Sequence, residues 1–372
     1  MKEKLLEYLR CPKCKGKLEL KKYSEDSEVR EGVILCGCGM WYPVIDYVPR
    51  ILLADLRGNY RDFADRHSLP QLPFGAKESE ESKIQVKQSF SDKWNIHPEF
   101  GFTSEKIKNF YDEWFASKIG ADGIKGMKSY FAGKNLALDA GTGLGPKVES
   151  MCKYGVKEAI GIDISESVVH AHENTKACPG AHIVQADIMN PPFKEEIFDF
   201  IISDGVLHHT PDTRKAFLSL VPFLRSNGDI AIHVYKKMGP VREFCDDYIR
   251  NHSTKLSSEE CWKFSESFTR FGKSLSGINV DIEVPEDIPV LGIKAGKYNL
   301  QRFIYYNFFK CFWNDGFSFD ENNLVNFDWY HPSDAFRHTE EEVKDWFKKA
   351  GLAEIKSFHA NESGVSVRGR KE

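Results

Sequence analysis

The sequence predicts an α/β fold built on a doubly wound parallel sheet, and two observations support this prediction. The first is the stretch Leu136–Gly145, LALDAGTGLG, in which an apolar run ends at an aspartate and three glycines follow at alternate positions. A strand, a tight turn and a helix start in this order form a cradle for a nucleotide-like ligand, because glycines permit close backbone approach. The second is the alternation of strand and helix patterns from Asn135 onward, which a parallel sheet requires.

Composition limits the class of protein. With 372 residues, 41% of them hydrophobic and 28% charged, the chain can hold two or three domains. The net charge of −4 gives no global attraction to nucleic acid or to anionic membranes. No apolar run approaches the roughly 20 residues that span a bilayer, and MKEKLLEYLR lacks a long apolar signal core. We therefore expect a cytoplasmic protein without a transmembrane segment, and its oligomeric state stays open.

Two close cysteine pairs near the N-terminus predict a metal site. Cys11 and Cys14 have the spacing CxxC, and Cys36 and Cys38 have the tighter spacing CxC, which leaves the metal occupancy open. Strand-like segments at 17–21 and 32–35 separate the pairs, as in a zinc ribbon. Four thiolates complete a closed tetrahedral shell, which is typical of structural Zn²⁺ rather than of a catalytic metal.

The residues around these cysteines carry a family resemblance. CPKCKGKLEL and ILCGCGMWYPVIDYVPRIL make residues 5–54 similar to the small zinc-ribbon protein that activates several tRNA and protein methyltransferases. The segment Tyr42–Asp46 and the following Pro49 are the most specific part of this resemblance outside the cysteines. Residues 2–10 are expected to form a short helix in front of the ribbon.

The next part of the chain is predicted as a linker followed by helices. Residues 55–80 are polar and punctuated by proline and glycine, and AKESEESK suggests a solvated linker. Helical patterns return at 84–94 and 104–118. In the second, Ile107, Phe110, Tyr111 and Trp114 recur with helical spacing and predict one aromatic face. We interpret this helix as packed on the following domain.

Three aspartates end three successive predicted strands. Asp139 ends the first strand, Asp163 ends the strand 159–162, and Asp187 follows the strand 182–185. Asp163 lies 18 residues after Gly145, near the offset of about 20 expected for an acid that holds ribose hydroxyls. A single aspartate at a strand end is commonly a turn or helix cap, and Ser165 is predicted to cap the helix that follows Asp163. Three acids at matched positions instead indicate a binding site.

The pattern D-x-G-x-G-x-G at Asp139–Gly145 differs from the dinucleotide fingerprint and resembles the cofactor loop of class I S-adenosylmethionine (SAM) methyltransferases. This resemblance implies that the glycine loop holds the methionine end of SAM and that Asp163 holds the ribose. It also implies that Asp187 accepts a hydrogen bond from the exocyclic amine of adenine. It also raises the alternative that the helix at 104–118 is a flap over the cofactor. The implied cofactor-binding residues are Asp139, Gly141, Thr142, Gly143, Gly145, Asp163, Ile164, Asp187, Ile188, Asp204 and Gly205.

Two motifs near the fourth strand bear on catalysis. Asn190–Phe193, NPPF, resembles a motif of methyltransferases that act on planar amines, but it precedes the strand 198–203 and is therefore predicted as a turn. After that strand, SDGVLHHTPD resembles the corresponding segment of ubiquinone- and menaquinone-type methyltransferases. This implies that His208 and His209 lie beside the transferred methyl group, where they either remove a substrate proton or pack against the cofactor. Asp212 is predicted to cap the next helix.

An insertion of about ninety-five residues separates Tyr235 from His331. It is rich in aromatic residues and is predicted to be a mostly helical lid that shapes a substrate pocket, or a helical subdomain with its own core. Residues 327–332, FDWYHP, are predicted as a loop, and Tyr330 is a candidate catalytic residue there. A helix after Thr339 and two strands at 353–358 and 364–368 complete a seven-stranded sheet of the methyltransferase type.

These observations predict a SAM-dependent methyltransferase with a Rossmann-like sheet, a fused zinc ribbon and a lid. The expected acceptor is a small or lipid-like molecule, and the alternative is an RNA or protein methyltransferase whose ribbon is a built-in activator or docking module. The predicted parts are the zinc ribbon at 1–54, a linker with helices at 55–130, the SAM-binding core at 131–236, the lid at 237–330 and the end of the core at 331–372.

Overall fold

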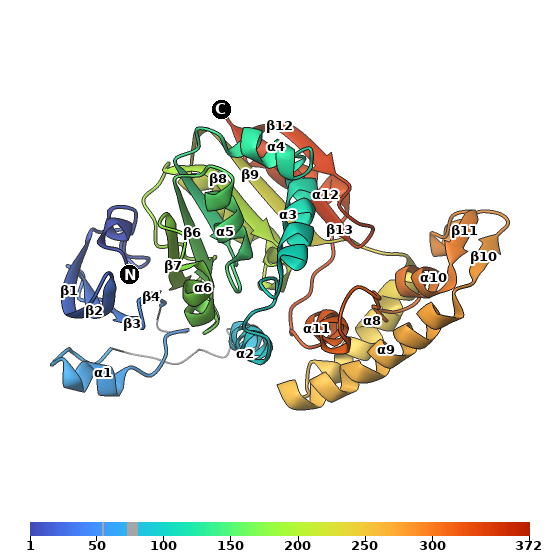
Figure 1. Cartoon of the computed structure of the whole chain (residues 1–372), viewed down its shortest axis with the longest axis horizontal. Coiled ribbons are helices and arrows are strands. Elements are labelled where there is room, and N and C mark those ends of the chain that lie inside the picture. Colours follow the sequence, from blue (N-terminus) through green and yellow to red (C-terminus); the bar gives the residue numbers. More distant parts are fainter. Residues whose placement is uncertain (54–55, 73–80) are drawn as a thin grey trace. The chain divides into compact units, whose positions relative to one another are not determined.

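The computed structural model describes residues 1–53, 56–72 and 81–372 (Figure 1). The described chain divides into two compact units. The first comprises Met1–Val234, Glu340–Ala360 and Val365–Glu372, and the second comprises Tyr235–Thr339 and Asn361–Gly364. Most of the AKESEESK segment, expected to be a linker, lies outside the described residues.

One continuous sheet organises the first unit. Its strand order is β1-β2-β3-β4-β7-β6-β5-β8-β9-β13-β12. The seven strands from β7 to β12 match the predicted seven-stranded sheet, which confirms the fold class, and the four ribbon strands extend it. The seven are β5 (Leu136–Ala140), β6 (Glu158–Asp163), β7 (Ala181–Ala186), β8 (Phe198–Asp204), β9 (Leu224–Tyr235), β12 (Leu352–Phe358) and β13 (Gly364–Lys371).

The central strands are buried on both faces. Every residue of β5, β6 and β7 is buried, and β8 becomes partly exposed only at its last residue. This explains why these strands read as apolar runs rather than as alternating patterns. Figure 1 shows helices of the first unit over the near face of the parallel strands. The helices on the two faces are α3 (Glu105–Ile119), α4 (Gly123–Phe131), α5 (Pro146–Lys153) and α6 (Val168–Thr175) on one side, and α7 (Thr213–Leu220) and α12 (Glu340–Lys349) on the other.

Helix α3 forms where a helix was predicted, but with a different buried face. Phe115, Ala116 and Ile119 are at most 3% exposed and join the core, whereas Phe110 is 45% exposed. These three residues form a second apolar stripe along the helix. Because it contains the small side chain of Ala116, this stripe packs more closely on the sheet than the predicted aromatic stripe can. The predicted cap at α7 is confirmed, because the Asp212 side chain accepts a hydrogen bond from the Lys215 N–H at 2.9 Å.

The ribbon is part of the same sheet as the core. It consists of the 3-10 turn η1 (Glu3–Glu7) and the strands β1 (Leu18–Glu25), β2 (Val29–Cys36), β3 (Trp41–Ile45) and β4 (Val48–Ile51). Strand β4 pairs in parallel with β7, with Arg50 opposite Gln185 and Ile51 opposite Ala186. The ribbon strands therefore continue the hydrogen-bonded ladder of the core.

The NPPF segment makes a second contact with the ribbon. Leu9 forms an antiparallel bridge with Phe193, and the Arg10 N–H donates to the Pro192 carbonyl at 2.8 Å. Phe193 is 1% exposed and packs edge to face against Phe198, with 5.2 Å between the ring centroids. The segment precedes β8, as predicted, and its bulky ring helps to attach the ribbon.

Part of the predicted linker is ordered. Helix α1 (Arg61–Arg66) packs on the ribbon, with the Phe63 ring stacked 6.0 Å from Trp41. The Arg57 guanidinium lies 4.2 Å from the centre of the Trp41 ring. The residues before AKESEESK, described from the sequence only as polar and punctuated by proline and glycine, thus contain a short helix whose aromatic and cationic side chains find partners on the ribbon surface.

The second unit is mostly helical, as predicted for the insertion. Helix α11 pairs with α9 and α8 around an aromatic core, and it covers most of the stretch predicted as a loop at 327–332. A capping box at Ser318 and Glu321 starts this helix, and Phe327, Trp329 and Tyr330 face its interior side. The elements are α8 (Pro240–Ser253), α9 (Ser258–Ile278), β10 (Asp281–Val284), η5 (Pro289–Leu291), β11 (Gly296–Asn299), α10 (Leu300–Asn307) and α11 (Phe319–Tyr330).

Within the described ranges, none of the helices combines the length and the apolar character needed to cross a membrane.

Candidate cofactor and metal sites

The acidic residues singled out in the sequence lie at one edge of the sheet. Asp139 belongs to β5, Asp163 ends β6, Asp187 directly follows β7 and Asp204 ends β8. These four strands are neighbours in the order β7-β6-β5-β8, and their parallel pairing brings their carboxyl ends together. Ligands of open parallel sheets bind at this edge.

The glycine loop is tightly built. Gly141 has a φ of 92°, and a Cβ there would come within 2.3 Å of the Val206 side chain. Gly143 has a φ of 53°, and a Cβ there would lie 3.3 Å from the indole of Trp94. Side chains at these positions would collide or strain the backbone, so glycine is required by geometry. The N–H groups of Gly141 and Thr142 both donate to the Ile162 carbonyl at 2.8 Å.

Asp163 is held in one orientation by its neighbours. One carboxylate oxygen accepts from the Gly143 N–H at 2.8 Å, and the other accepts from the Ser165 N–H at 2.9 Å and hydroxyl at 2.6 Å. The prediction that Ser165 caps a helix was wrong, because α6 begins only at Val168 and the Ser165 hydroxyl is used by Asp163. Next to this acid, Ile164 is half-buried.

Asp139 is buried without a hydrogen-bond partner. Its side chain is 0% exposed, and within the described part of the chain neither carboxylate oxygen has a donor. Burial raises its pKa to about 6, although the positive charge of Lys147 opposes this rise. A buried carboxylate without donors is costly, so this group is poised to accept a ligand's donor groups.

Asp204 lies in a cluster of buried charges that the sequence did not predict. It pairs with Lys118 of α3 at 2.7 Å and with Lys147 of α5 at 3.2 Å. Burial lowers the pKa of Lys118 to about 8, although Asp204 raises it. The two lysines hold the pKa of Asp204 well below its usual value in spite of burial. Beside them, Gly205 donates its N–H to the His233 carbonyl at 2.9 Å.

The sequence contained one weak signal of this cluster. Lys147 directly follows the proline that starts α5, where the helix dipole favours acidic side chains. A lysine in that first turn therefore indicates a local negative partner. Lys118 lies on the helix noted for its aromatic face, and its ammonium also contacts the Trp114 ring at 3.4 Å.

Asp187 has local partners at the end of β7. It accepts from the Met189 N–H at 2.8 Å and from the Asn190 side-chain amide at 3.0 Å, and it pairs with Lys83 at 3.5 Å. The following Ile188 is 7% exposed and packs in the core. A carboxylate with these contacts retains lone pairs for a further donor.

The two histidines lie on a 3-10 turn, η3 (Leu207–His209), directly after β8. His208 is 0% and His209 is 3% exposed, and their ring centroids are 4.3 Å apart. The edge-to-face partner of His209 is Phe90, at 5.1 Å between ring centroids. Both histidines are therefore at the predicted end of the sheet, inside the protein rather than on an open loop.

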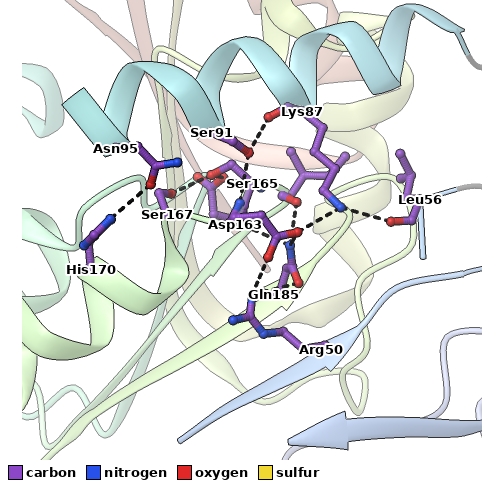
Figure 2. Close-up of polar contacts among 12 residues, drawn as sticks. Arg50, Leu56, Lys87, Ser91, Asn95, Asp163, Ser165, Ser167, His170 and Gln185 are labelled. Carbon is purple, nitrogen blue, oxygen red and sulfur yellow. Dashed lines mark hydrogen bonds and ion pairs between the residues drawn. The ribbon is translucent and has the colours of Figure 1, made fainter. Parts of the chain in front are cut away.

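Helix α2 (Glu81–Ile96) covers the loop that carries Asp163, as Figure 2 shows. The Ser91 hydroxyl accepts from the Glu166 N–H at 3.1 Å, and Lys87 pairs with the Glu166 carboxylate at 3.1 Å. At the far end of the helix, Asn95 bonds to His170 at 3.1 Å. The family resemblance raised the alternative that the helix at 104–118 is a flap over the cofactor. In the structure the preceding helix, α2, contacts both the glycine loop and the loop after β6.

The ribbon reaches the same loop through Arg50. Its guanidinium bonds to Glu166 at 2.9 Å and to the Gln185 side-chain oxygen at 3.0 Å (Figure 2). Gln185 in turn donates to the Ser165 carbonyl at 3.1 Å. The side chain of Arg50 is 6% exposed whereas that of Glu166 is 47% exposed, so this ion pair lies at the boundary between the core and the solvent. Two residues, Gln185 and Ser165, therefore connect Arg50 of the ribbon to Asp163.

Tyr330, the third candidate catalytic residue, belongs to the second unit. It is 0% exposed, and its hydroxyl donates to the Lys310 carbonyl at 2.7 Å. Burial raises its pKa well above 10. Its ring packs against Phe264 and Phe268 in the core of that unit.

The four ribbon cysteines gather at one point. The sulfur atoms of Cys11, Cys14, Cys36 and Cys38 all lie within 4.8 Å of one another. A tetrahedral zinc with Zn–S bonds of about 2.3 Å needs sulfur atoms about 4 Å apart. The cluster fits this requirement, and four thiolates leave no open position for substrate. The tighter CxC spacing is therefore compatible with a closed structural site.

Comparisons with known proteins agree with both parts of the first unit. Residues 138–232 match the family model described as a methyltransferase domain, and residues 2–46 match the model described as Trm112p-like protein. Both resemblances predicted from the sequence are thereby confirmed. Together with the cysteine cluster, they identify a SAM-type methyltransferase domain and a zinc-binding ribbon.

Individual relatives are distant. A protein of Encephalitozoon cuniculi named as a methyltransferase is 25% identical over 36% of this chain, and an uncharacterized protein of Methanocaldococcus jannaschii is 28% identical over 35%. The chain matches 64% and 60% of their respective lengths. Among solved structures, the magnesium protoporphyrin IX methyltransferase of Synechocystis is 11% identical, over 78% of this chain and 100% of its own, with a TM-score of 0.40. That score is too low to support an inference about function. The chain thus carries a methyltransferase domain joined to a Trm112p-like ribbon.

Proposed function

We propose that the protein transfers a methyl group from SAM to a small or lipid-like acceptor. The observation that supports SAM as the donor is the set of unsatisfied and oppositely charged groups at the carboxyl ends of β5 and β8. SAM ends in an amino acid, which carries one ammonium and one carboxylate. The Asp139 carboxylate is a hydrogen-bond acceptor without a donor. The Lys118–Asp204–Lys147 cluster provides both positive and negative charge.

The remaining roles follow the order of the strands. Asp163 would accept the ribose hydroxyls, and Asp187 would accept the adenine amine. Thr142 belongs to the turn at the methionine end, while Ile164 and Ile188 flank the two acids. SAM supplies an activated methyl group, so the protein has to position the acceptor, exclude water and, where needed, take up a proton.

Two observations favour a small or lipid-like acceptor. The NPPF segment, which would suggest a planar amine substrate, is occupied by contacts with the ribbon. The insertion after β9 forms a unit rich in aromatic side chains. His208 and His209 are the proposed groups for proton removal, and both are buried after β8. Tyr330 is retained as a candidate whose role Tyr330→Phe would test.

The test combines binding with transfer. Calorimetry should show binding of SAM by the purified protein. Transfer of a labelled methyl group from SAM should then be followed into separated metabolite, lipid, RNA and protein fractions of a lysate from a deletion strain. Label in the metabolite or lipid fraction is the expected result. Label confined to RNA or protein would refute the acceptor class, and absence of SAM binding would refute the activity and leave a regulatory or scaffold role.

A second candidate function is methylation of RNA or protein with the ribbon as a built-in activator or docking module. The observation that favours it is the continuity of the Trm112p-like ribbon with the core sheet through β4 and β7. RNA binding that weakens with salt and disappears when charges on the ribbon surface are neutralised would support it. The full chain should be used, because the ribbon strands belong to the sheet.

A further inference from the structure

Helix α2 contacts the loops that follow all four of the strands with carboxyl-end acids. Its contacts, one for each strand, are Trp94 against Gly143 after β5, Ser91 with Glu166 after β6, Lys83 with Asp187 after β7 and Phe90 with His209 after β8. A ligand that bonds to Asp187 has to share this carboxylate with Lys83 or displace the lysine. Access to this edge of the sheet therefore depends on the position of α2.

The attachment of α2 to the sheet is mainly polar. The structure describes this helix over its whole length, and its buried side chains are Val86 and the polar residues Ser89, Ser91 and Lys93. Phe90 and Trp94 are half-buried, and Ile96 is 52% exposed. Segments with few buried apolar contacts open at a lower free energy than core elements do. We therefore expect α2 to open while the sheet stays folded.

One carboxylate joins α2 to the ribbon. Glu166 accepts a hydrogen bond from Arg50 of β4 at 2.9 Å through one oxygen, and its other oxygen pairs with Lys87 of α2 at 3.1 Å. Gln185 donates to that second oxygen at 2.9 Å and accepts from Arg50 at 3.0 Å. Figure 2 shows the Arg50 and Lys87 side chains reaching this point from the ribbon strand and from α2.

These contacts fix the Glu166 side chain in its charged form. Burial raises the pKa of Glu166, but the positive charges of Lys87 and Arg50 lower it below its usual value. The Lys87 ammonium also donates to the Leu56 carbonyl at 3.2 Å, a short way along the chain from β4. Substitution of Lys87 would therefore remove two contacts, whereas substitution of Glu166 removes only those of the carboxylate.

We propose that Glu166 is a positioning residue through which the ribbon controls the opening of α2 over the cofactor site. A partly exposed ion pair contributes little by itself, because two long side chains have to be ordered. Arg50 and Gln185 order the Glu166 carboxylate beforehand, so its pairing with Lys87 loses less entropy. The description of the covered edge as a cofactor site rests on the proposed function, whereas the coupling between Arg50, Glu166 and α2 does not.

Hydrogen exchange of the ligand-free full chain, measured by mass spectrometry at pH 7, tests the coupling without SAM. Glu166→Gln keeps the shape of the side chain and removes its charge, so the amides of 85–96 should exchange at least threefold faster. Arg50→Met should accelerate the same amides at least twofold, although it changes the ribbon. In the combined variant Arg50→Met should add nothing, because it acts through Glu166. Exchange in β5 and β6 should be unchanged throughout.

Glu196→Gln is the matched control. Glu196 pairs with Lys371 at 2.9 Å and lies before β8, at the end of the sheet opposite to that contacted by α2. Its substitution should leave the exchange of α2 unchanged. Unchanged or slower exchange of α2 in Arg50→Met, or additive acceleration in the combined variant, would overturn the proposal. If Arg50→Met does not fold, Arg50→Gln, which can still donate to Gln185, takes its place in the same comparison.

SAM kinetics test the effect on the covered site. A helix that has to open slows both entry and exit of a ligand. Stopped-flow tryptophan fluorescence should therefore show SAM association and dissociation both at least threefold faster in Glu166→Gln. Faster dissociation alone would overturn the role in opening. Absence of SAM binding in calorimetry would refute the proposed function, and hydrogen exchange would still decide the coupling. SAM binding combined with unchanged exchange in Arg50→Met would refute the coupling alone.

Discussion

Replacement of Asp139 by asparagine should stabilise the ligand-free protein while weakening its binding of SAM. The carboxylate is fully buried, has no donor in the described part of the structure and has a pKa of about 6. Its charged form therefore opposes folding at neutral pH. Asparagine has nearly the same shape and carries no charge, so the substitution removes this cost.

The magnitude follows from the pKa. A carboxyl group with a pKa of 3.8 in the unfolded chain and about 6 in the folded protein binds more protons when folded between these values. Stability therefore falls as the pH rises through this range and is constant above it. The shift of about two units corresponds to about 3 kcal/mol at pH 7 and to about 1 kcal/mol at pH 4.5. These are upper values for the gain, because the asparagine amide also has to be buried.

Urea denaturation of the ligand-free protein at pH 4.5 and pH 7 measures this gain, and calorimetry measures the loss of SAM affinity. The matched control is Asp112→Asn, because Asp112 is 3% exposed but is bonded to Ser150, Lys153 and Tyr154. That variant should be destabilised. The reasoning fails if Asp139→Asn is destabilised at pH 7, or if its gain is the same at both pH values.

Three further variants and one control test other parts of the molecule. Asp163→Ala should lower SAM affinity at least tenfold, since a hydrogen bond to a charged group contributes about 1.5–3 kcal/mol; unchanged binding in calorimetry would contradict the ribose role. A Cys11→Ser, Cys14→Ser variant should lose its zinc in elemental analysis, whereas Cys245→Ser should retain one zinc per chain; equal zinc contents would contradict the assignment. Phe193→Ala should cost about 3–5 kcal/mol of unfolding free energy, as expected for removal of a buried phenyl ring. Full stability combined with lost methyl transfer would instead indicate that NPPF acts in catalysis.

Strands and their ends were the most predictable part of the fold. Because β5, β6 and β7 are buried on both faces, they appear in the sequence as apolar runs, and Asp139, Asp163 and Asp187 lie at or within one residue of their ends. The helices were harder, since α3 carries two apolar stripes and only tertiary packing decides between them. Likewise, the apolar residues of α11 do not gather on one face, because buried asparagines such as Asn326 share the face that lies against the core. For this reason the sequence predicted a loop where the structure has a helix.

The residues of the candidate site could be predicted only where they belong to one local sequence motif. The glycine loop and the strand-end acids follow local patterns, whereas the partners of Asp204 come from distant elements. Lys118 lies 86 residues before Asp204 in the chain, and no local pattern joins them. The same holds for Arg50, whose partner Glu166 lies 116 residues away. Contacts of this kind depend on how the sheet assembles.

The continuous sheet also changes which strand the protein presents to other chains. Without the ribbon, β7 would be an edge strand, and its sequence AHIVQA would expose unpaired backbone groups on a flat apolar segment. Such edges promote strand-to-strand aggregation. In the intact chain β4 occupies that edge, and the terminal strand becomes β1, LELKKYSE, which carries Lys21 and Lys22. Charged side chains on an edge strand oppose further pairing. Loss of zinc would therefore threaten the solubility of the whole enzyme. The edge at risk is β7, which lies more than 130 residues away in sequence from β4, the ribbon strand that protects it.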